Sequence, residues 1–345
     1  MNPLALSTFI TSLAAGTTIT LSAHHWFLAW IGLEINTLAV IPLMTKTPHP
    51  RTIEATTKYF LIQATASALI LFSSTINAWH TGQWEMNQLL PATSIPITIA
   101  LAMKLGLAPL HFWMPEVIQG LPLLTGLILS SWQKIAPMFL LIQISQLINI
   151  HLITALGLAS ILISGWSSIN QTQLRKLLAF SSIGHLGWMV IIMKFSPNLA
   201  SLNFIIYITL TMTMFLSLFY LSSTKISQLA TSWLKSPTTT ALTMLSLLSL
   251  GGLPPLTGFM PKLLISLELC KQNAQLLVLM MLLASILALF FYLRLTFYTT
   301  LTLPPNTSPS KILWRRSSKP QMIFALLNSL TLLLLPLTPT IILLI

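Results

Sequence analysis

Long apolar stretches recur along the whole chain and are separated by short polar loops. A helix that crosses about 30 Å of hydrocarbon needs roughly 20 apolar residues. Segments of about this length predict eleven membrane spans, near residues 3–22, 25–45, 55–79, 95–119, 123–143, 150–168, 174–194, 198–222, 238–269, 274–300 and 322–344. We therefore expect an all-α, polytopic membrane protein that leaves no room for a soluble domain.

The composition excludes a water-soluble globular protein. Charged residues make up 6% of the 345 positions and hydrophobic residues 54%, whereas about a quarter of a typical soluble protein is charged. No basic region precedes the first apolar segment, and no small-residue cleavage site follows it. We therefore expect the N-terminus to form the first span rather than a removable signal.

The sequence offers little for a cofactor to bind. Cys270 is the single cysteine, which excludes an internal disulfide, a four-cysteine zinc site and a self-contained iron–sulfur cluster. Neither a GxGxxG motif nor a P-loop is present, so a nucleotide site is not expected. We expect no metal, no cofactor and no redox centre on this chain.

The formal charge of +12 is spread unevenly over the loops. Membrane proteins carry an excess of lysine and arginine in the loops on the side from which they are inserted. Eleven spans place alternate loops on opposite sides of the membrane. The loops of one side, together with the start of the third span, hold eleven cations, whereas the loops of the other side hold two, Lys194 and Lys271. These are Lys46, Arg51, Lys58, Arg175, Lys176, Lys225, Lys235, Lys311, Arg315, Arg316 and Lys319. The charge therefore indicates topology rather than nucleic-acid binding, with the N-terminus on the cationic side and the C-terminus on the other.

A proline-rich motif occurs twice in the chain. GLAPLHFWMPE at 106–116 and GLPPLTGFMPK at 252–262 share six of eleven positions at an offset of 146 residues. When 146 is added to the first residue of each of the first five spans, the result lies close to the first residue of each of the next five. An odd number of spans in each unit reverses its orientation, which predicts two inverted five-helix repeats. The expected domains are residues 1–145, residues 146–302, and residues 303–345 with a loop and a terminal helix.

Each copy of the motif predicts a discontinuous helix. Proline removes a backbone donor and clashes with the preceding turn, and freed carbonyls inside a membrane need protein or water as partners. Matched broken helices in two halves point to an ion or substrate site. A simple packing kink is the alternative for each proline.

Four charged residues lie deep inside the expected spans, away from the ends where Arg294 and others can reach water, and each costs about 2.5–3.5 kcal/mol on insertion scales. They are Glu34, Lys104, Lys134 and Lys262. Burial favours neutral lysine and a nearby carboxylate favours charged lysine, so such a lysine can bind and release a proton. We expect Glu34 to pair with Lys104, and Lys134 and Lys262 to continue a proton relay. A static ion pair that fixes helix packing is the alternative for Glu34 and Lys104.

Two histidines are weaker candidates for the same relay. His111 lies in the first break and His185 in the stretch SSIGHLGW. Imidazole titrates near neutrality, which suits proton transfer. Either side chain would serve equally well as a hydrogen-bonded polar residue between helices.

Seven stretches together carry a family resemblance over the whole chain. They are MNPL, WIGLEINTLAVIPLM, KYFLIQATAS, MKLGLAPLHFWMPEV, LILSSWQKIAP, QLRKLLAFSSIGHLGW and LGGLPPLTGFMPK. By these motifs the chain resembles the animal form of the NADH–ubiquinone oxidoreductase chain 2 family. Its members are mitochondrially encoded, antiporter-like membrane subunits of respiratory complex I.

The resemblance implies a proton-translocating subunit of NADH:ubiquinone reductase in the mitochondrial inner membrane, with the cationic side facing the matrix and the C-terminus facing the intermembrane space. It implies that Glu34 pairs with Lys104, that Lys134 connects two half-channels, and that Lys262 ends the second. NADH, FMN, iron–sulfur clusters and ubiquinone would bind other subunits, and the partners would be membrane-arm subunits and lipids.

Two other functions stay open on the sequence alone. One is a stand-alone cation/proton antiporter, and the other is a structural membrane-arm subunit that conducts nothing. The offset of 146 places Lys104 opposite Leu250 and Lys262 opposite Glu116. The two halves therefore differ chemically, and the direction of the relay is not given by the repeat.

Overall fold

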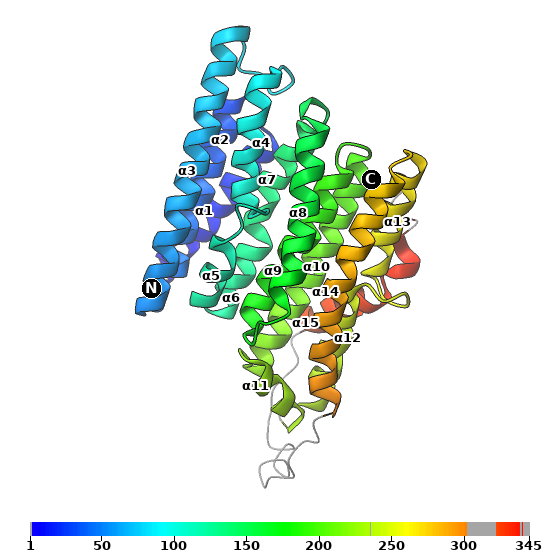
Figure 1. Cartoon of the computed structure of the whole chain (residues 1–345). Helices are drawn as coiled ribbons and strands as arrows, with labels where there is room; N and C mark the ends of the chain where they lie inside the picture. The colour runs from blue at the N-terminus through cyan, green and yellow to red at the C-terminus, as the bar shows by residue number, and fades with distance from the viewer. Residues whose placement is uncertain (1, 235, 302–321, 339, 341–345) are drawn as a thin grey trace. The chain divides into compact units, whose positions relative to one another are not determined.

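The computed structural model describes residues 2–234, 236–301, 322–338 and 340. This part of the chain is helical, and its extended pairings are two isolated bridges, His25 with Glu85 and Gln173 with Lys225 (Figure 1). The prediction of an all-α membrane fold is confirmed. Four cations of the 301–320 loop, and Lys235, lie outside the described residues.

Seven helical segments are long and apolar enough to cross a membrane. They are α1 (Pro3–Leu21), α2 (Trp26–Met44), α3 (Pro50–Thr81), the pair α6 (Leu123–Ser130) and α7 (Trp132–Gln143), α8 (Ile150–Ser168), α10 (Pro197–Leu221) and α14 (Gln275–Leu301). Each coincides with an expected span.

The other four expected spans contain helices that are broken, short or charged at one end. They are α4 (Pro91–Leu105) with α5 (Trp113–Gly120), α9 (Leu174–Ile192), α12 (Pro237–Gly251) with α13 (Phe259–Lys271), and α15 (Met322–Leu333) followed by a turn at Leu335–Leu337. Short elements at Ser145–Leu147, α11 (Ile226–Ala230) and Thr231–Leu234 connect the longer ones. Helix α9 carries Arg175 and Lys176 in its first turn.

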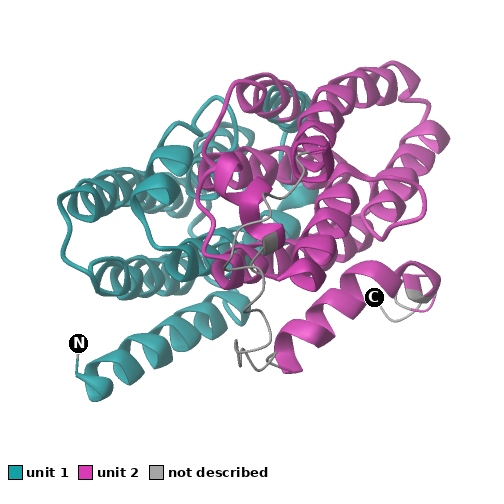
Figure 2. Ribbon diagram, turned by 90° about the horizontal axis from the view of Figure 1, so that it is seen from below, with its two compact units in different colours: residues 1–160 teal, residues 161–345 magenta. Residues whose placement is uncertain are grey.

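The chain divides into two compact units, residues 1–160 and 161–345, which Figure 2 distinguishes by colour. In the first unit α1 packs on α2, α3 packs on α4 and α5, and α7 packs on α1, α2 and α4. In the second unit α10 packs on α9, α12, α13 and α15, and α14 packs on α9, α11, α12 and α13. The boundary between the units falls inside α8.

Corresponding helices of the two units keep the offset seen in the sequence. Helices α4 and α12 both have 15 residues and both begin with proline, at Pro91 and Pro237. Helices α5 and α13 begin at Trp113 and Phe259, again 146 residues apart. The inverted orientation of the halves and the domain limits 1–145, 146–302 and 303–345 stay predictions.

Both proline-rich motifs break their helix as predicted. Gly106 follows α4 with φ of 77°, and Gly252 follows α12 with φ of 81°. Glycine adopts this left-handed conformation without a Cβ penalty and is the usual residue after a helix end. In the first break the Trp113 indole also donates a hydrogen bond of 3.1 Å to the Met103 carbonyl. The discontinuous helices are therefore built from local sequence.

A third break, which the sequence analysis missed, lies in the fifth span. Helix α6 ends at Ser130 and α7 begins at Trp132, with Ser131 at φ −110° and ψ −68° between them. The Ser131 hydroxyl donates a hydrogen bond of 2.7 Å to the Leu127 carbonyl. Pro137 inside α7 also lacks an N–H and leaves the Gln133 carbonyl without its helical donor. Lys134 therefore lies within the first turn after a break rather than in an unbroken helix.

Candidate functional site

Glu34 projects from α2 in the first unit and is half-buried. The Thr37 hydroxyl, one turn later, donates hydrogen bonds to the Glu34 carboxylate oxygen Oε2 at 3.1 Å and to the Glu34 carbonyl at 2.9 Å. The carboxylate lies near enough for its charge to act on both the Lys104 ammonium and the Tyr59 hydroxyl. Helix α2 thus supplies the negative charge of a polar site inside the unit.

Lys104 lies in the last turn of α4, directly before the break at Gly106. Its side chain is 5% exposed, and its Nζ has no hydrogen-bond partner in the part of the chain that the structure describes. The ion pairs among the described residues do not include Lys104 with Glu34. The two charges therefore interact at a distance and not in direct contact. The position of Lys104 near the C-terminal end of α4 also favours a cation, because the helix dipole is negative there.

Tyr59 is a member of this site that the sequence analysis missed. It lies on α3, is 2% exposed, and its ring centroid is 5.9 Å from that of Trp113 at the start of α5. The ring thus packs on the start of α5, and the hydroxyl lies within reach of the Glu34 charge. The only signal in the sequence is one tyrosine in an apolar segment, and this does not distinguish a site residue from a packing residue.

Lys134 and His111 are buried in the same unit, with exposed fractions of 2% and 3%. Lys134 lies on α7, which packs on both α2 and α4. The neighbouring Gln133 side chain donates a hydrogen bond of 3.3 Å to the Asn36 carbonyl and so ties α7 to α2. His111 lies in the first break, with its ring centroid 4.4 Å from that of Phe112. The structure thus places all four sequence-predicted residues of this unit on adjoining elements.

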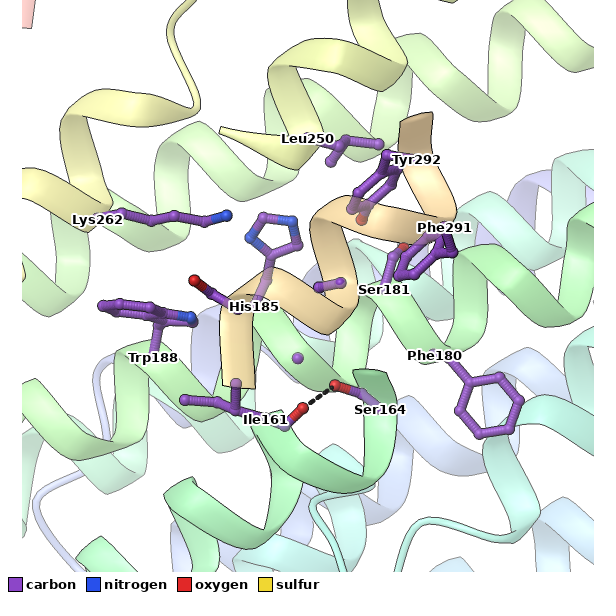
Figure 3. A pocket seen from close by; sticks show the side chains of 13 residues that line it. Ile161, Ser164, Phe180, Ser181, His185, Trp188, Leu250, Lys262, Phe291 and Tyr292 are labelled. Atoms are coloured by element: carbon purple, nitrogen blue, oxygen red, sulfur yellow. Dashed lines mark hydrogen bonds between the residues drawn. The ribbon is translucent and has the colours of Figure 1, made fainter. Parts of the chain in front are cut away.

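Lys262 and His185 share a cavity in the second unit. In Figure 3 the Lys262 ammonium points towards the His185 imidazole, and Ser164, Ser181, Trp188 and Tyr292 line the same space. The cavity holds about 20 Å³, which is room for about one water molecule with polar partners. Two sequence-predicted relay residues, one from α13 and one from α9, are therefore brought together.

The second break holds the Lys262 side chain in place. Its Nζ donates a hydrogen bond of 2.8 Å to the carbonyl of Gly251, the last residue of α12. Glycine suits the next position, Gly252, because of its φ of 81°, and a Cβ there would lie 2.8 Å from Nζ, so the end of the lysine would have to shift. The break thereby supplies a backbone acceptor to a buried cation.

Two tyrosines and two serines complete the polar cluster of the second unit, and sequence analysis missed all four. Tyr207 of α10 interacts through its hydroxyl with Ser182, and Tyr292 of α14 interacts with Ser181, while both serines lie on α9. The ring centroids of Tyr207 and His185 are 5.9 Å apart. Both tyrosines are buried, and hydroxyls of this kind can relay protons between titratable groups.

Two carboxylates of the first unit, Glu54 and Glu116, form ion pairs at the surface. Lys58 Nζ lies 2.6 Å from Glu54 and 2.7 Å from Glu116, with side-chain exposures between 41% and 63%. Exposed pairs of this kind add little stability. Among the described residues, no three histidine, cysteine or carboxylate side chains converge as metal ligands would. Glu54 and Glu116 thus form contact ion pairs with Lys58, whereas Lys104 is in none of the ion pairs among the described residues.

Comparisons with known proteins identify the family. The profile of the NADH:quinone oxidoreductase/Mrp antiporter membrane family matches residues 23–288, and that of the C-terminus of NADH dehydrogenase subunit 2 matches residues 289–342. NADH-ubiquinone oxidoreductase chain 2 of Aquarana catesbeiana is 64% identical over 344 residues, covering 100% of both chains. The same protein of Xenopus laevis is 58% identical, covering 98% of this chain and 99% of the relative.

A solved structure shares the fold at low sequence identity. A chain of respiratory complex I from Thermus thermophilus superposes with a TM-score of 0.83 at 24% identity, covering 97% of this chain and 80% of that one. At this identity the likeness shows the fold, and the full-length relatives show the family. Since these relatives match from end to end at more than half of all positions, the chain belongs to the NADH-ubiquinone oxidoreductase chain 2 family.

Proposed function

We propose that this chain is a membrane-arm subunit of respiratory complex I in the mitochondrial inner membrane and conducts protons there. The relay would consist of Glu34, Lys104, Lys134 and Lys262, with His111 and His185 as additional members. The full-length match to animal chain 2 proteins supports the assembly and the location. The burial of Lys104 without a contact partner supports proton exchange above all other observations.

The chemistry of these residues suits proton transfer. Taking an ammonium out of water disfavours its charged form, and a carboxylate nearby favours it. Glu34 acts on Lys104 from a distance, so a small change in their separation alters the proton affinity of the lysine.

Electron transfer takes place elsewhere in this proposal. The chain would carry no redox centre, and NADH, FMN, iron–sulfur clusters and ubiquinone would bind partner subunits of the complex. Redox chemistry in those subunits would drive changes at Glu34 and Lys104, and the chain would convert them into proton movement. Neighbouring membrane-arm subunits and lipids would cover its apolar exterior.

The proposal is tested by comparing the complete complex with the isolated chain in liposomes. We expect the complex to build a pH gradient when NADH and a ubiquinone analogue are supplied, and we expect no exchange of sodium or potassium for protons by the isolated chain. A pH-sensitive dye inside the vesicles measures both. Cation-dependent proton movement by the isolated chain would contradict the proposal and support a stand-alone antiporter.

A second expected result concerns membrane topology. With Cys270 replaced by serine, a single cysteine introduced by Ser308→Cys should react with an impermeant thiol reagent from the matrix side. A tag at the C-terminus should be accessible from the intermembrane side. The cationic bias of the loops motivates this orientation. Reaction of both positions from one side would disprove the count of eleven spans.

A further inference from the structure

A second, smaller cavity of the second unit adjoins the cavity that holds Lys262. It encloses about 10 Å³ and is lined mainly by leucines, among them Leu178, Leu218, Leu247 and Leu295. Its polar lining residues are Thr243, whose hydroxyl donates to the Thr240 carbonyl at 2.7 Å, and Tyr292, whose hydroxyl interacts with Ser181. A buried water needs two to four polar partners and about 10–15 Å³ of space, so a cavity of this size whose two hydroxyls are already hydrogen-bonded disfavours water, and we refer to it as the dry cavity.

Phe291 and Tyr292 separate the two cavities. Both residues line both spaces, and their ring centroids are 4.0 Å apart. In Figure 3 the two aromatic side chains lie between α14 and α9, on the side of the cavity away from Lys262. The hydrogen bond between Tyr292 and Ser181 fixes one of the rings across the boundary. The wall between the polar and the dry cavity is thus made of anchored aromatic rings.

The dry cavity lies towards the cationic loops. Its lining includes Leu174, the first residue of α9 and the neighbour of Arg175, and Leu229 of α11, which follows Lys225. Leu218 lies one turn before the end of α10. The loops at these helix ends belong to the cationic side of the membrane, which the family resemblance assigns to the matrix. A proton moving from these loops to Lys262 would therefore have to cross the leucine layer.

We propose that Leu178, Leu218, Leu247 and Leu295, closed by Phe291 and Tyr292, form a hydrophobic seal between Lys262 and the cationic side of the membrane. An apolar constriction excludes water and interrupts conduction without a mechanical plug. The seal restricts proton exchange at Lys262 to the other side, which prevents protons that have passed the relay from returning. The inference rests on the proposed function and adds to it the residues that keep proton movement in one direction.

The test places a polar group in the seal. Leu247 is 2% exposed, and Leu247→Asn preserves its approximate size while offering hydrogen bonds to water. In liposomes holding the assembled complex, the rate at which protons return during NADH oxidation should rise about tenfold, equivalent to a barrier lower by about 1.4 kcal/mol. Leu247→Met keeps the layer apolar, and Leu245→Asn puts the same amide on the exposed face of α12. Both controls should retain the low return rate.

A double variant tests whether the leak passes through Lys262. Leu247→Asn combined with Lys262→Met should show the return rate of Lys262→Met alone. A return rate in Leu247→Asn equal to that of the unmodified complex would show that the leucine layer is only packing. A leak that persists in the double variant would show damage to the helix bundle and would also overturn the seal. Failure of the proposed function is recognised separately, since the unmodified complex would then build no gradient.

Discussion

Replacing Lys134 by methionine should leave the complex assembled and reduce coupled proton pumping by about a hundredfold, the lower end of what a positioned acid–base group contributes. Methionine retains most of the volume of the lysine stem and removes a charge that is 2% exposed. Swaps that conserve side-chain volume are tolerated well in packed interiors, so the complex should still assemble. The measurement is the pH gradient formed per NADH oxidised in liposomes, together with the amount of assembled complex.

Lys134→Arg separates proton exchange from a fixed charge. Arginine keeps the positive charge but does not release its proton at accessible pH. We expect this variant to assemble and to lose pumping as the methionine variant does. Full pumping by Lys134→Arg would show that a permanent charge is sufficient. Full pumping by both variants would instead support a structural subunit that conducts nothing.

Glu34→Gln should lower coupled turnover by about tenfold while the complex still assembles. A tenfold loss of rate corresponds to a barrier higher by about 1.4 kcal/mol, which we expect from removing one charge that acts on Lys104. Glutamine is nearly isosteric and can still accept the hydrogen bond from Thr37 that now reaches Oε2 at 3.1 Å. The substitution removes the negative charge that acts on Lys104. Lys104 should then spend more time neutral, because burial alone disfavours its charged form.

Thr37→Val provides the matched control for this experiment. It removes the hydroxyl that donates to Glu34 and leaves the carboxylate charge in place. We expect a smaller loss of turnover than in Glu34→Gln. The two variants are compared by protons pumped per electron in purified complex. Unchanged pumping in an assembled Glu34→Gln complex would exclude Glu34 from the relay.

The breaks at Gly106 and Gly252 could be predicted from sequence because their causes are local. Proline and glycine act on the backbone at their own positions, so two matched motifs were enough to locate both discontinuities. The break at Ser131 has a weaker marker, because Pro137 lies six residues after it and no glycine stands at the break. A serine hydroxyl that bonds the carbonyl four residues earlier often bends a helix, as Ser131 does with Leu127, but serine occurs in many unbroken helices and so does not predict a break.

The individual charges of the site were predictable, whereas their neighbours were not. A lysine inside an apolar span is conspicuous in any sequence because of its insertion cost. Tyr59, Tyr207 and Tyr292 lie among apolar residues where tyrosine is common, and their roles follow from contacts between helices far apart in the chain. The separation between Glu34 and Lys104 likewise depends on how α2 and α4 are packed. The sequence therefore predicted that the two residues interact, but it could not predict how far apart they lie.

The isolation of the Lys104 ammonium has a consequence for how this protein can evolve. Its Nζ is buried without a hydrogen-bond partner in the described structure, and replacing such a charge by an apolar group of similar volume commonly stabilises a protein. Selection for heat resistance would therefore favour loss of this lysine, while selection for respiration would favour keeping it. If Lys104 takes part in proton transfer as proposed, its retention would limit the thermal tolerance of the subunit, a trade-off known from other functional sites.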